Sequence, residues 1–256
     1  MSDENQPILF SIDDTVARIT LNRPEKRNAL NGALVSGIKA ALRKANAVDA
    51  VSVVVITGAG QDFCSGADLE ALRRIANASV ADNAGDARSF MEVFVLIRQV
   101  AVPVIAAVRG RALAGGCGLA SACDIVLAST NARFGYPEVK IGFVPAMVTA
   151  ILRRNISEKR AFELLARGAE ITAEEARHVG LVNQVFSEES FEAEVTAYAR
   201  GFELMSRSAV ALTKTLLYQM DGMAFGDALE TGVDVNVVAR MTEDCQKGIA
   251  RFVKRE

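Results

Sequence analysis

Residues 110–125, GRALAGGCGLASACDI, place glycines at 115, 116 and 118 among small apolar residues. The run before them, VPVIAAV (102–108), and the run at their end, DIVLAS (124–129), are almost wholly apolar. Such runs are typical of strands buried on both faces of a parallel sheet. Glycine allows a backbone to approach a neighbouring group closely. The stretch therefore predicts a strand, a tight loop, a short helix and a second parallel strand.

The same order occurs earlier in the chain. VSVVVITG (51–58) is a second buried apolar run, followed by a loop and the helical pattern GADLEALRRIA (66–76). Apolar and polar residues alternate on either side of Asp13 and Asp14, which predicts an N-terminal β-hairpin. A helix is expected over 32–46, capped by Asn28 or Asn31. The repeated alternation indicates an α/β core with right-handed crossovers.

Two further segments complete the prediction. Residues 78–86, ASVADNAGD, are small and polar and predict a mobile connection to an amphipathic helix at 87–100. Strand patterns stop near residue 145, and the patterns beyond it are helical. The last third of the chain is therefore expected to be a helical region.

Composition excludes several classes of protein. The chain has 256 residues, half of them hydrophobic, which is enough for a full core. A net charge of −2 argues against a general nucleic-acid surface. The apolar runs are too short for a membrane span and MSDENQP lacks a signal-peptide pattern, so a cytoplasmic location is expected. The four cysteines form no C-x-x-C pair and His178 is the only histidine, so a zinc site is not expected.

Common catalytic and nucleotide motifs are also missing. GAGQDF (58–63) lacks the third glycine of the dinucleotide fingerprint, and no Walker A motif occurs. No G-x-S-x-G elbow accompanies His178, whose place in EEARHVG predicts the end of a helix. These absences argue against nucleotide binding and against Ser-His-Asp or cysteine catalysis.

Two loops remain that offer backbone chemistry. In DFCSGADLE (62–70) and ALAGGCGLA (112–120) a small-residue loop enters a helix, whose first N–H groups have no intrahelical acceptor. If parallel strands bring both helix starts together, one N–H from each stabilises negative charge on a single oxygen. Gly66, Ala67, Gly115 and Gly116 would let a substrate approach. The alternative is that these small residues only permit tight strand–helix packing.

Glu138 is the candidate acid/base. It lies in RFGYPEVKIGFVP (133–145), where most neighbours are apolar. Burial among them would disfavour the charged carboxylate and suit it to proton transfer near neutral pH. The alternative is a surface glutamate paired with Lys140 or an arginine.

Five segments, in their order and spacing, resemble the enoyl-CoA hydratase/isomerase (crotonase) family over nearly the whole chain. They are ITLNRPEKRNALN, FCSGADL, GRALAGGCGLASACDI, FGYPEVKIGF and TEDCQKGIARF. The resemblance implies an α/β spiral of β-β-α turns over residues 1–195, which holds an acyl-CoA site. It also implies a helical oligomerisation region over 196–256 and assembly as a homotrimer or a hexamer of two trimers.

The resemblance also implies the site residues. The backbone N–H groups of Ala67 and Gly115 would hold the thioester oxygen while Glu138 moves protons, and coenzyme A would enter as part of the substrate, with no separate cofactor. The positions expected to contact substrate or coenzyme A are Arg27, Ala29, Ser65, Ala67, Asp68, Leu69, Gly115 and Gly118. Arg23 and Lys26 are further candidates for the phosphates, and Lys254 or Arg255 for the coenzyme A of a neighbouring subunit.

Gly118 departs from the pattern of two-glutamate hydratases, which have a glutamate there. We expect this position to leave room for a branched or bulky acyl group. The alternative is that Gly118 only permits tight packing of its helix. Asp82, Asp86, Glu92 and Tyr136 are weak candidates to assist Glu138.

The function predicted is hydration of a 2-enoyl-CoA thioester, with a branched substrate such as methylglutaconyl-CoA included. The alternative reaction is Δ3,Δ2-enoyl-CoA isomerisation. A module of this fold that binds RNA or another protein is an alternative of another class, and a nicotinamide-dependent oxidoreductase is a third. Neither nucleic acid nor membrane is expected as a partner.

Overall fold

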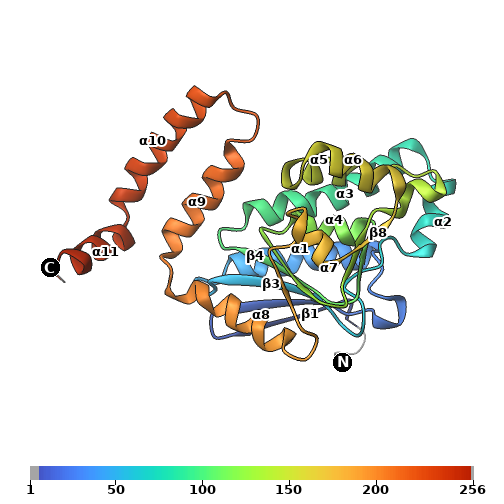
Figure 1. The fold of residues 1–256 in the computed structure, drawn as a ribbon, viewed down its shortest axis with the longest axis horizontal. Helices are drawn as coiled ribbons and strands as arrows, with labels where there is room; N and C mark the ends of the chain where they lie inside the picture. Colours follow the sequence, from blue (N-terminus) through green and yellow to red (C-terminus); the bar gives the residue numbers. More distant parts are fainter. Residues whose placement is uncertain (1–5, 255–256) are drawn as a thin grey trace.

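The computed structural model describes residues 6–254. Its helices and strands, in chain order, are β1 (Ile8–Asp13), β2 (Val16–Leu21), η2 (Pro24–Lys26), α1 (Gly32–Asn46), β3 (Val53–Gly58), α2 (Leu69–Asn77), α3 (Val80–Gln99), β4 (Val104–Val108), β5 (Arg111–Leu113), α4 (Gly115–Ala122), β6 (Ile125–Ser129), β7 (Arg133–Gly135), η3 (Pro137–Ile141), α5 (Ala146–Asn155), α6 (Glu158–Arg167), β8 (Glu170–Thr172), α7 (Ala173–His178), β9 (Gln184–Phe186), α8 (Phe191–Arg200), η4 (Gly201–Leu204), α9 (Arg207–Gln219), α10 (Phe225–Met241) and α11 (Glu243–Val253). The labels follow Figure 1.

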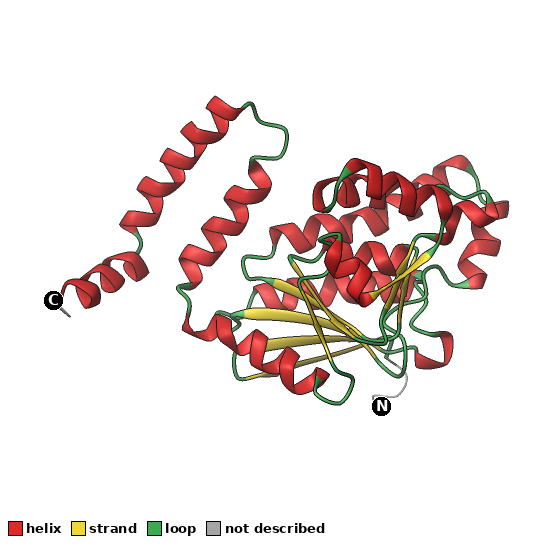
Figure 2. Ribbon diagram, in the orientation of Figure 1, coloured by secondary structure: helices red, strands yellow, loops and turns green. Residues whose placement is uncertain are grey.

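A six-stranded sheet in the order β1-β2-β3-β4-β6-β9 forms the centre of the molecule. The expected hairpin β1–β2 is antiparallel, and every later neighbour in this sheet pairs in parallel. Helices cover both faces, as Figure 2 shows, with α8 on one face and α1, α3 and α4 on the other. Burial on both faces explains why β3 and β4 are continuous apolar runs.

The chain advances through β-β-α turns. The strand β4 is followed by the short strand β5 and then by α4, and β6 is followed by β7 and then by η3 and α5. The short strands β5, β7 and β8 form a second sheet. The predicted α/β spiral is confirmed, and a single residue separates the start of α4 from β5, a strand of the second sheet.

Two expectations about secondary structure are wrong. Residues 80–86 belong to α3, because the Ser79 hydroxyl accepts a hydrogen bond from the Asp82 backbone N–H (3.1 Å) and so caps the helix. Strands also continue beyond residue 145, since β8 pairs with β7 and β9 pairs with β6. Each has three residues, which is too short for an alternating pattern to be recognised.

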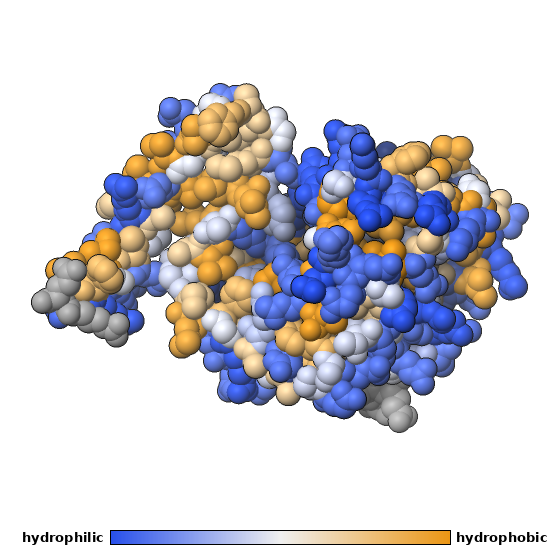
Figure 3. Space-filling view, viewed as in Figure 1, coloured by the Kyte–Doolittle hydropathy of each residue, from blue (hydrophilic) through white to orange (hydrophobic). Residues whose placement is uncertain are grey.

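The C-terminal helices α9, α10 and α11 project from one side of the body (Figure 1). On α10 a stripe of apolar residues recurs every fourth position, and each is more than half exposed: Phe225, Leu229, Val233, Val237 and Met241. Figure 3 shows apolar surface gathered over this projection. The predicted boundary between residues 195 and 196 falls within α8, and the division into two units stays a prediction. None of the described helices is long and apolar enough to cross a membrane.

Candidate active site

The two loops singled out in the sequence lie side by side. Cys64 and Ala112 form a parallel β-bridge between them. The Cys64 N–H donates to the Arg111 carbonyl (3.0 Å), and the Leu113 N–H donates to the Cys64 carbonyl (2.9 Å). The loop before α2 is thereby held against the loop before α4, which brings the two helix starts together as the sequence predicted.

This contact explains two of the glycines. A Cβ on Gly66, whose φ is +96°, would lie 2.9 Å from the Ala114 Cβ, and a Cβ on Gly116 would lie 2.3 Å from the Cys64 carbonyl oxygen. Ala114 itself has a φ of +50°, a conformation that an L-residue adopts only where its surroundings impose it. Tight packing and site construction are therefore the same feature here, and the two interpretations left open by the sequence do not exclude each other.

Ala67 and Gly115 present free N–H groups. Ala67 forms a parallel bridge with Leu30, in which the Leu30 N–H donates to Gly66 (2.7 Å) and the Asp68 N–H donates to Leu30 (2.9 Å). Because alternate residues of an extended segment point to opposite sides, the N–H of Ala67 faces away from Leu30. Within residues 6–254, neither the Ala67 N–H nor the Gly115 N–H has a protein acceptor.

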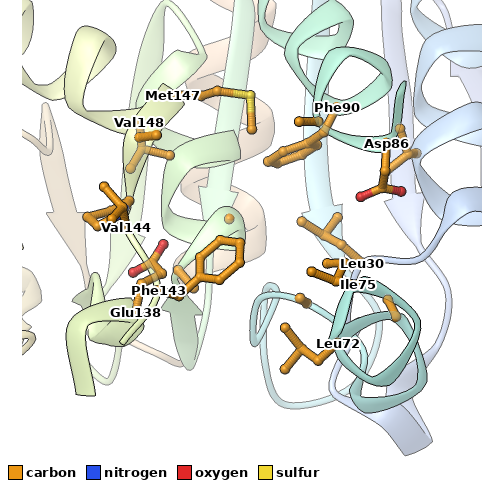
Figure 4. Close-up of a pocket in the computed structure, with 18 of the residues that line it drawn as sticks. Leu30, Leu72, Ile75, Asp86, Phe90, Glu138, Phe143, Val144, Met147 and Val148 are labelled. Atoms are coloured by element: carbon orange, nitrogen blue, oxygen red, sulfur yellow. The ribbon is translucent and has the colours of Figure 1, made fainter. Parts of the chain in front are cut away.

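Both residues line a cavity of about 670 Å³. Its wall is mainly apolar and is formed by the start of α1, by α2, α3 and η3, and by the segment from Ile141 into α5. The residues labelled in Figure 4 are Leu30, Leu72, Ile75, Asp86, Phe90, Glu138, Phe143, Val144, Met147 and Val148. A cavity of this size with few polar groups suits an acyl chain.

Glu138 lies in the wall of this cavity, at the start of η3 after Pro137. Its side chain is directed into the cavity beside Phe143 (Figure 4). Burial raises the pKa of the Glu138 carboxyl above the ordinary value of 4.5. Its Oε2 is buried and makes no hydrogen bond within the described chain. An ion pair with Lys140 or an arginine, the alternative left open by the sequence, is absent from the described residues.

Residues 11–256 match the family described as enoyl-CoA hydratase/isomerase. The chain belongs to this family. A putative enoyl-CoA hydratase of Thermus thermophilus is 38% identical over 240 residues, which cover 94% of this chain and 95% of that protein. The 2,3-dehydroadipyl-CoA hydratase of Escherichia coli is 34% identical over 249 residues, 97% and 96% of the two chains. An enoyl-CoA hydratase structure from Mycobacterium smegmatis has a TM-score of 0.93 at 29% identity, covering 98% and 97%.

Membership in the family confirms the crotonase fold, and the structure corrects the expectation for Gly118. A Cβ on Gly118 would lie 2.2 Å from Cγ1 of Val148. Gly118 is buried and is not one of the residues that line the cavity. Val148, on α5, fills the space that the missing side chain was expected to leave. Gly118 therefore serves the close packing of α4 on α5, and Val148 lines the cavity in its place.

The residues expected near coenzyme A have different surroundings. The Arg23 guanidinium donates to the Asp68 carboxylate (2.7 Å) and to the Ala29 carbonyl (2.6 Å), and Asp68 also caps α2 through the Glu70 N–H (2.8 Å). The hydrogen bond from Arg23 lowers the pKa of Asp68. Arg23, Asp68 and buried Ala29 thus form an internal structural cluster, which argues against a direct phosphate contact for Arg23.

The other residues expected to contact substrate or coenzyme A either line the cavity or are exposed to solvent. Ser65 lines the cavity, whereas Lys26, Arg27 and Leu69 are exposed and are not part of its lining. Lys254 is exposed after α11. Arg255 lies outside the described residues. No coenzyme A contact of these side chains follows from the structure, and their roles stay predictions.

Of the candidates to assist Glu138, only Asp86 lines the same cavity. Asp82 is bonded to the Ser79 hydroxyl (2.6 Å), and Glu92 pairs with Lys39 (2.8 Å). Tyr136 is buried, and its hydroxyl bonds to Ser121 (2.8 Å) on α4. His178 is the last residue of α7, as predicted.

Several side chains that shape the cavity were not predicted from the sequence. Phe90 packs edge-on against Phe94, with ring centroids 4.7 Å apart, and its ring edge lies 3.2 Å from where a Gly115 Cβ would be. Met147 and Val148 follow Pro145 at the start of α5. The helical spacing of Phe90 and Phe94 was recognisable, but which cavity that helix face borders depends on the position of α3.

Proposed function

We propose that this protein is an enoyl-CoA hydratase that adds water across the double bond of a 2-enoyl-CoA thioester. The observation that supports it most directly is the sharing of one apolar cavity by two unpaired backbone N–H groups, of Ala67 and Gly115, and by the unpaired carboxylate oxygen of Glu138. Curated relatives named as hydratases support the same reaction.

In this proposal the thioester oxygen accepts hydrogen bonds from Ala67 and Gly115. Glu138 takes a proton from water while the water oxygen bonds to acyl C3, and the electrons of the double bond move toward the thioester to form an enolate. The two N–H groups stabilise that oxyanion, each contributing a factor on the order of a hundred to a thousand in rate. Protonated Glu138 then protonates C2, which gives the 3-hydroxyacyl thioester and restores the carboxylate. This series of reaction steps requires no metal ion or other cofactor.

The second candidate is isomerisation of a 3-enoyl to a 2-enoyl thioester. What favours it is the apolar surrounding of α4: Phe90 lies beside Gly115, and Val148 covers Gly118. Glu138 would then act without a second carboxylate from α4. Isomerisation needs only one group that removes a proton from C2 and returns it to C4. Since Val148 fills the space at Gly118, that position gives no support to a branched substrate such as methylglutaconyl-CoA.

We further propose assembly into a homotrimer or a hexamer. The exposed apolar stripe on α10 supports it, because a monomer would leave that stripe in water.

The decisive experiment measures products from crotonyl-CoA and from a 3-enoyl-CoA with the wild type and Glu138→Gln. Hydration by the wild type with at least a hundredfold loss in Glu138→Gln, and with retained binding of a saturated acyl-CoA, supports the proposal. Isomerised product without hydration supports the second candidate. A Glu138→Gln variant that keeps full hydration activity would rule out the acid/base assignment.

A further inference from the structure

A buried tyrosine connects the segment that carries Glu138 to the helix that carries Gly115. Tyr136 lies two residues before Glu138, between β7 and η3, and is 1% exposed. Its hydroxyl oxygen lies 2.8 Å from the hydroxyl oxygen of Ser121, a buried residue of α4. Neither Tyr136 nor Ser121 lines the cavity that Glu138 and Gly115 share. Both can therefore influence the reaction only through other residues.

The direction of this hydrogen bond follows from its surroundings. The Ser121 hydroxyl donates its one proton to the Cys117 carbonyl (2.7 Å), one helical turn earlier in α4. The Tyr136 hydroxyl is therefore the donor, and the Ser121 oxygen is the acceptor. The Asn155 side chain, at the end of α5, donates to the carbonyl of Ser121 (2.8 Å). The acceptor of Tyr136 is thus held in place by contacts that do not involve Tyr136.

The same two segments are also joined through their backbones. β5 and β7 pair in parallel, and the Ala114 N–H donates to the Gly135 carbonyl (2.8 Å) directly before α4 begins. Ser121 lies six residues after Gly115, which is about 9 Å along the helix axis. The chain entering η3 is therefore attached to α4 at two separate points. Two such points fix an orientation as well as a position, whereas one point leaves a rotation free.

Glu138 depends on this attachment because its own carboxylate is weakly held. Oε2 is buried and has no hydrogen-bond partner within residues 6–254. A strong donor to the carboxylate would stabilise its charged form and oppose the rise in pKa that burial causes. The carboxylate of an acid/base is thus best left free for water and substrate. Its placement must then come from the backbone of η3 and from the residues that anchor that backbone.

We propose that Tyr136 and Ser121 are a positioning pair, whose hydrogen bond sets the placement of Glu138 relative to the backbone N–H of Gly115. This inference rests on the proposed function, which puts the thioester oxygen at Gly115 and the reacting carbon atoms between that N–H and Glu138. Tyr136 does not touch the substrate. Its role therefore differs from the direct assistance to Glu138 that the sequence suggested.

Tyr136→Phe removes the hydroxyl and keeps the ring that fills the core. Ser121 keeps its hydrogen bond to Cys117, so its hydroxyl stays paired. We expect kcat for crotonyl-CoA to fall on the order of tenfold, because a misplacement of about 1 Å costs on the order of a hundredfold and the attachment at Gly135 remains. The KM, and the Kd for the saturated thioester butyryl-CoA, should change less than about twofold.

Tyr198→Phe is the matched control, since it makes the same chemical change on α8, away from the cavity that Glu138 lines. It should leave kcat unchanged. The stoichiometry of butyryl-CoA binding in calorimetry gives the folded fraction of each variant, by which kcat is corrected. The inference would be overturned by an unchanged kcat in Tyr136→Phe or by an equal loss in Tyr198→Phe. A fall in butyryl-CoA affinity as large as the fall in kcat would also overturn it, because it would indicate a general disturbance of the cavity.

Ser121→Ala tests the pair from the acceptor side. If both residues act through their shared hydrogen bond, Tyr136→Phe/Ser121→Ala should lose no more activity than the larger of the two single losses. Losses that multiply in the double variant would show that the two residues act independently, and would overturn the pair.

Exchange of the C2 protons of butyryl-CoA in D₂O, followed by NMR, separates this inference from the proposed function. Glu138 removes a C2 proton, the electrons of that C–H bond form the enolate held by Ala67 and Gly115, and the carboxyl group returns a deuteron after exchange with solvent. No water is added to the acyl chain.

If the wild type exchanges these protons but does not hydrate crotonyl-CoA, the hydratase assignment fails. An exchange rate lowered on the order of tenfold in Tyr136→Phe would then still support the positioning pair. If the wild type hydrates crotonyl-CoA, and Tyr136→Phe hydrates and exchanges at the wild-type rates, the positioning pair is wrong and the hydratase assignment stands.

Discussion

Gly118→Ala is expected to destabilise the protein although it places alanine in a helix. The new Cβ would lie 2.2 Å from Cγ1 of Val148, whereas ordinary contacts are 3.4 Å or longer, so the two groups must separate by more than 1 Å. Overpacking of this kind costs about 1–3 kcal/mol. Exchanging glycine for alanine within a helix returns up to about 1 kcal/mol. The net loss of unfolding free energy should be about 1–2 kcal/mol.

Two further variants isolate the contact. Val148→Ala removes both γ-methyl groups of a buried valine and should cost about 2 kcal/mol by itself. In the double variant the methyl group added at position 118 enters the vacated space, so the loss should fall short of the sum of the single losses by roughly 1 kcal/mol or more. Gly85→Ala, in α3 with no atom within 4 Å of the new Cβ, is the control and should stabilise the protein.

Urea denaturation followed by circular dichroism measures the unfolding free energies of the wild type and the four variants. The close packing of α4 on α5 would be refuted if Gly118→Ala were as stable as Gly85→Ala. It would also be refuted if the losses in the double variant were strictly additive. The same variants report on the substrate cavity, because Val148 lines it. Val148→Ala should enlarge the cavity and favour bulkier acyl groups, in a comparison of linear and branched thioesters.

Three other predictions follow from the site and from the attachment of α9. Ala67→Pro removes one oxyanion donor and should lower kcat on the order of a hundredfold or more in a folded protein. Ala67→Ser keeps the backbone N–H, so its effect on kcat should be small. Full turnover by Ala67→Pro would contradict the assignment. The raised pKa of Glu138 means that the folded state binds its proton more tightly than the unfolded state, so this group stabilises the fold below pH 4.5 and that contribution is lost as the pH rises through the folded-state pKa. Relative to Glu138→Gln, the wild type should therefore become less stable as the pH increases to neutral, while its hydration rate rises over the same range; parallel stability profiles would argue against the shift. The ammonium of Lys214 is buried against Asp124 (2.7 Å) and the carbonyls of Ile97 and Val102, so Lys214→Met should cost about 3–5 kcal/mol in urea denaturation, and the exposed Lys247→Met should have little effect; similar losses would be unexpected.

The sequence alone determined the elements whose signals are local. The β3 and β4 runs were recognisable because strands covered on both faces are apolar throughout. The start of α1 was recognisable because the Asn31 side chain caps it. Short strands such as β8 and β9 were missed, because three residues carry too little pattern.

Only the tertiary structure decided how these elements form a site. Ala67 and Gly115 are far apart in the chain, and the bridge between Cys64 and Ala112 brings their loops together. The sequence identified Glu138 by its apolar neighbours, but its burial in the same cavity depends on the packing of η3 and α5.

Gly118 shows the limit of local reasoning most clearly. The absence of a side chain is visible in the sequence, but whether that absence leaves space depends on what packs there, and Val148 comes from a helix thirty positions later. Close-packed interiors fill every gap with whichever side chain the fold brings near, and this filling is a property of the folded chain as a whole.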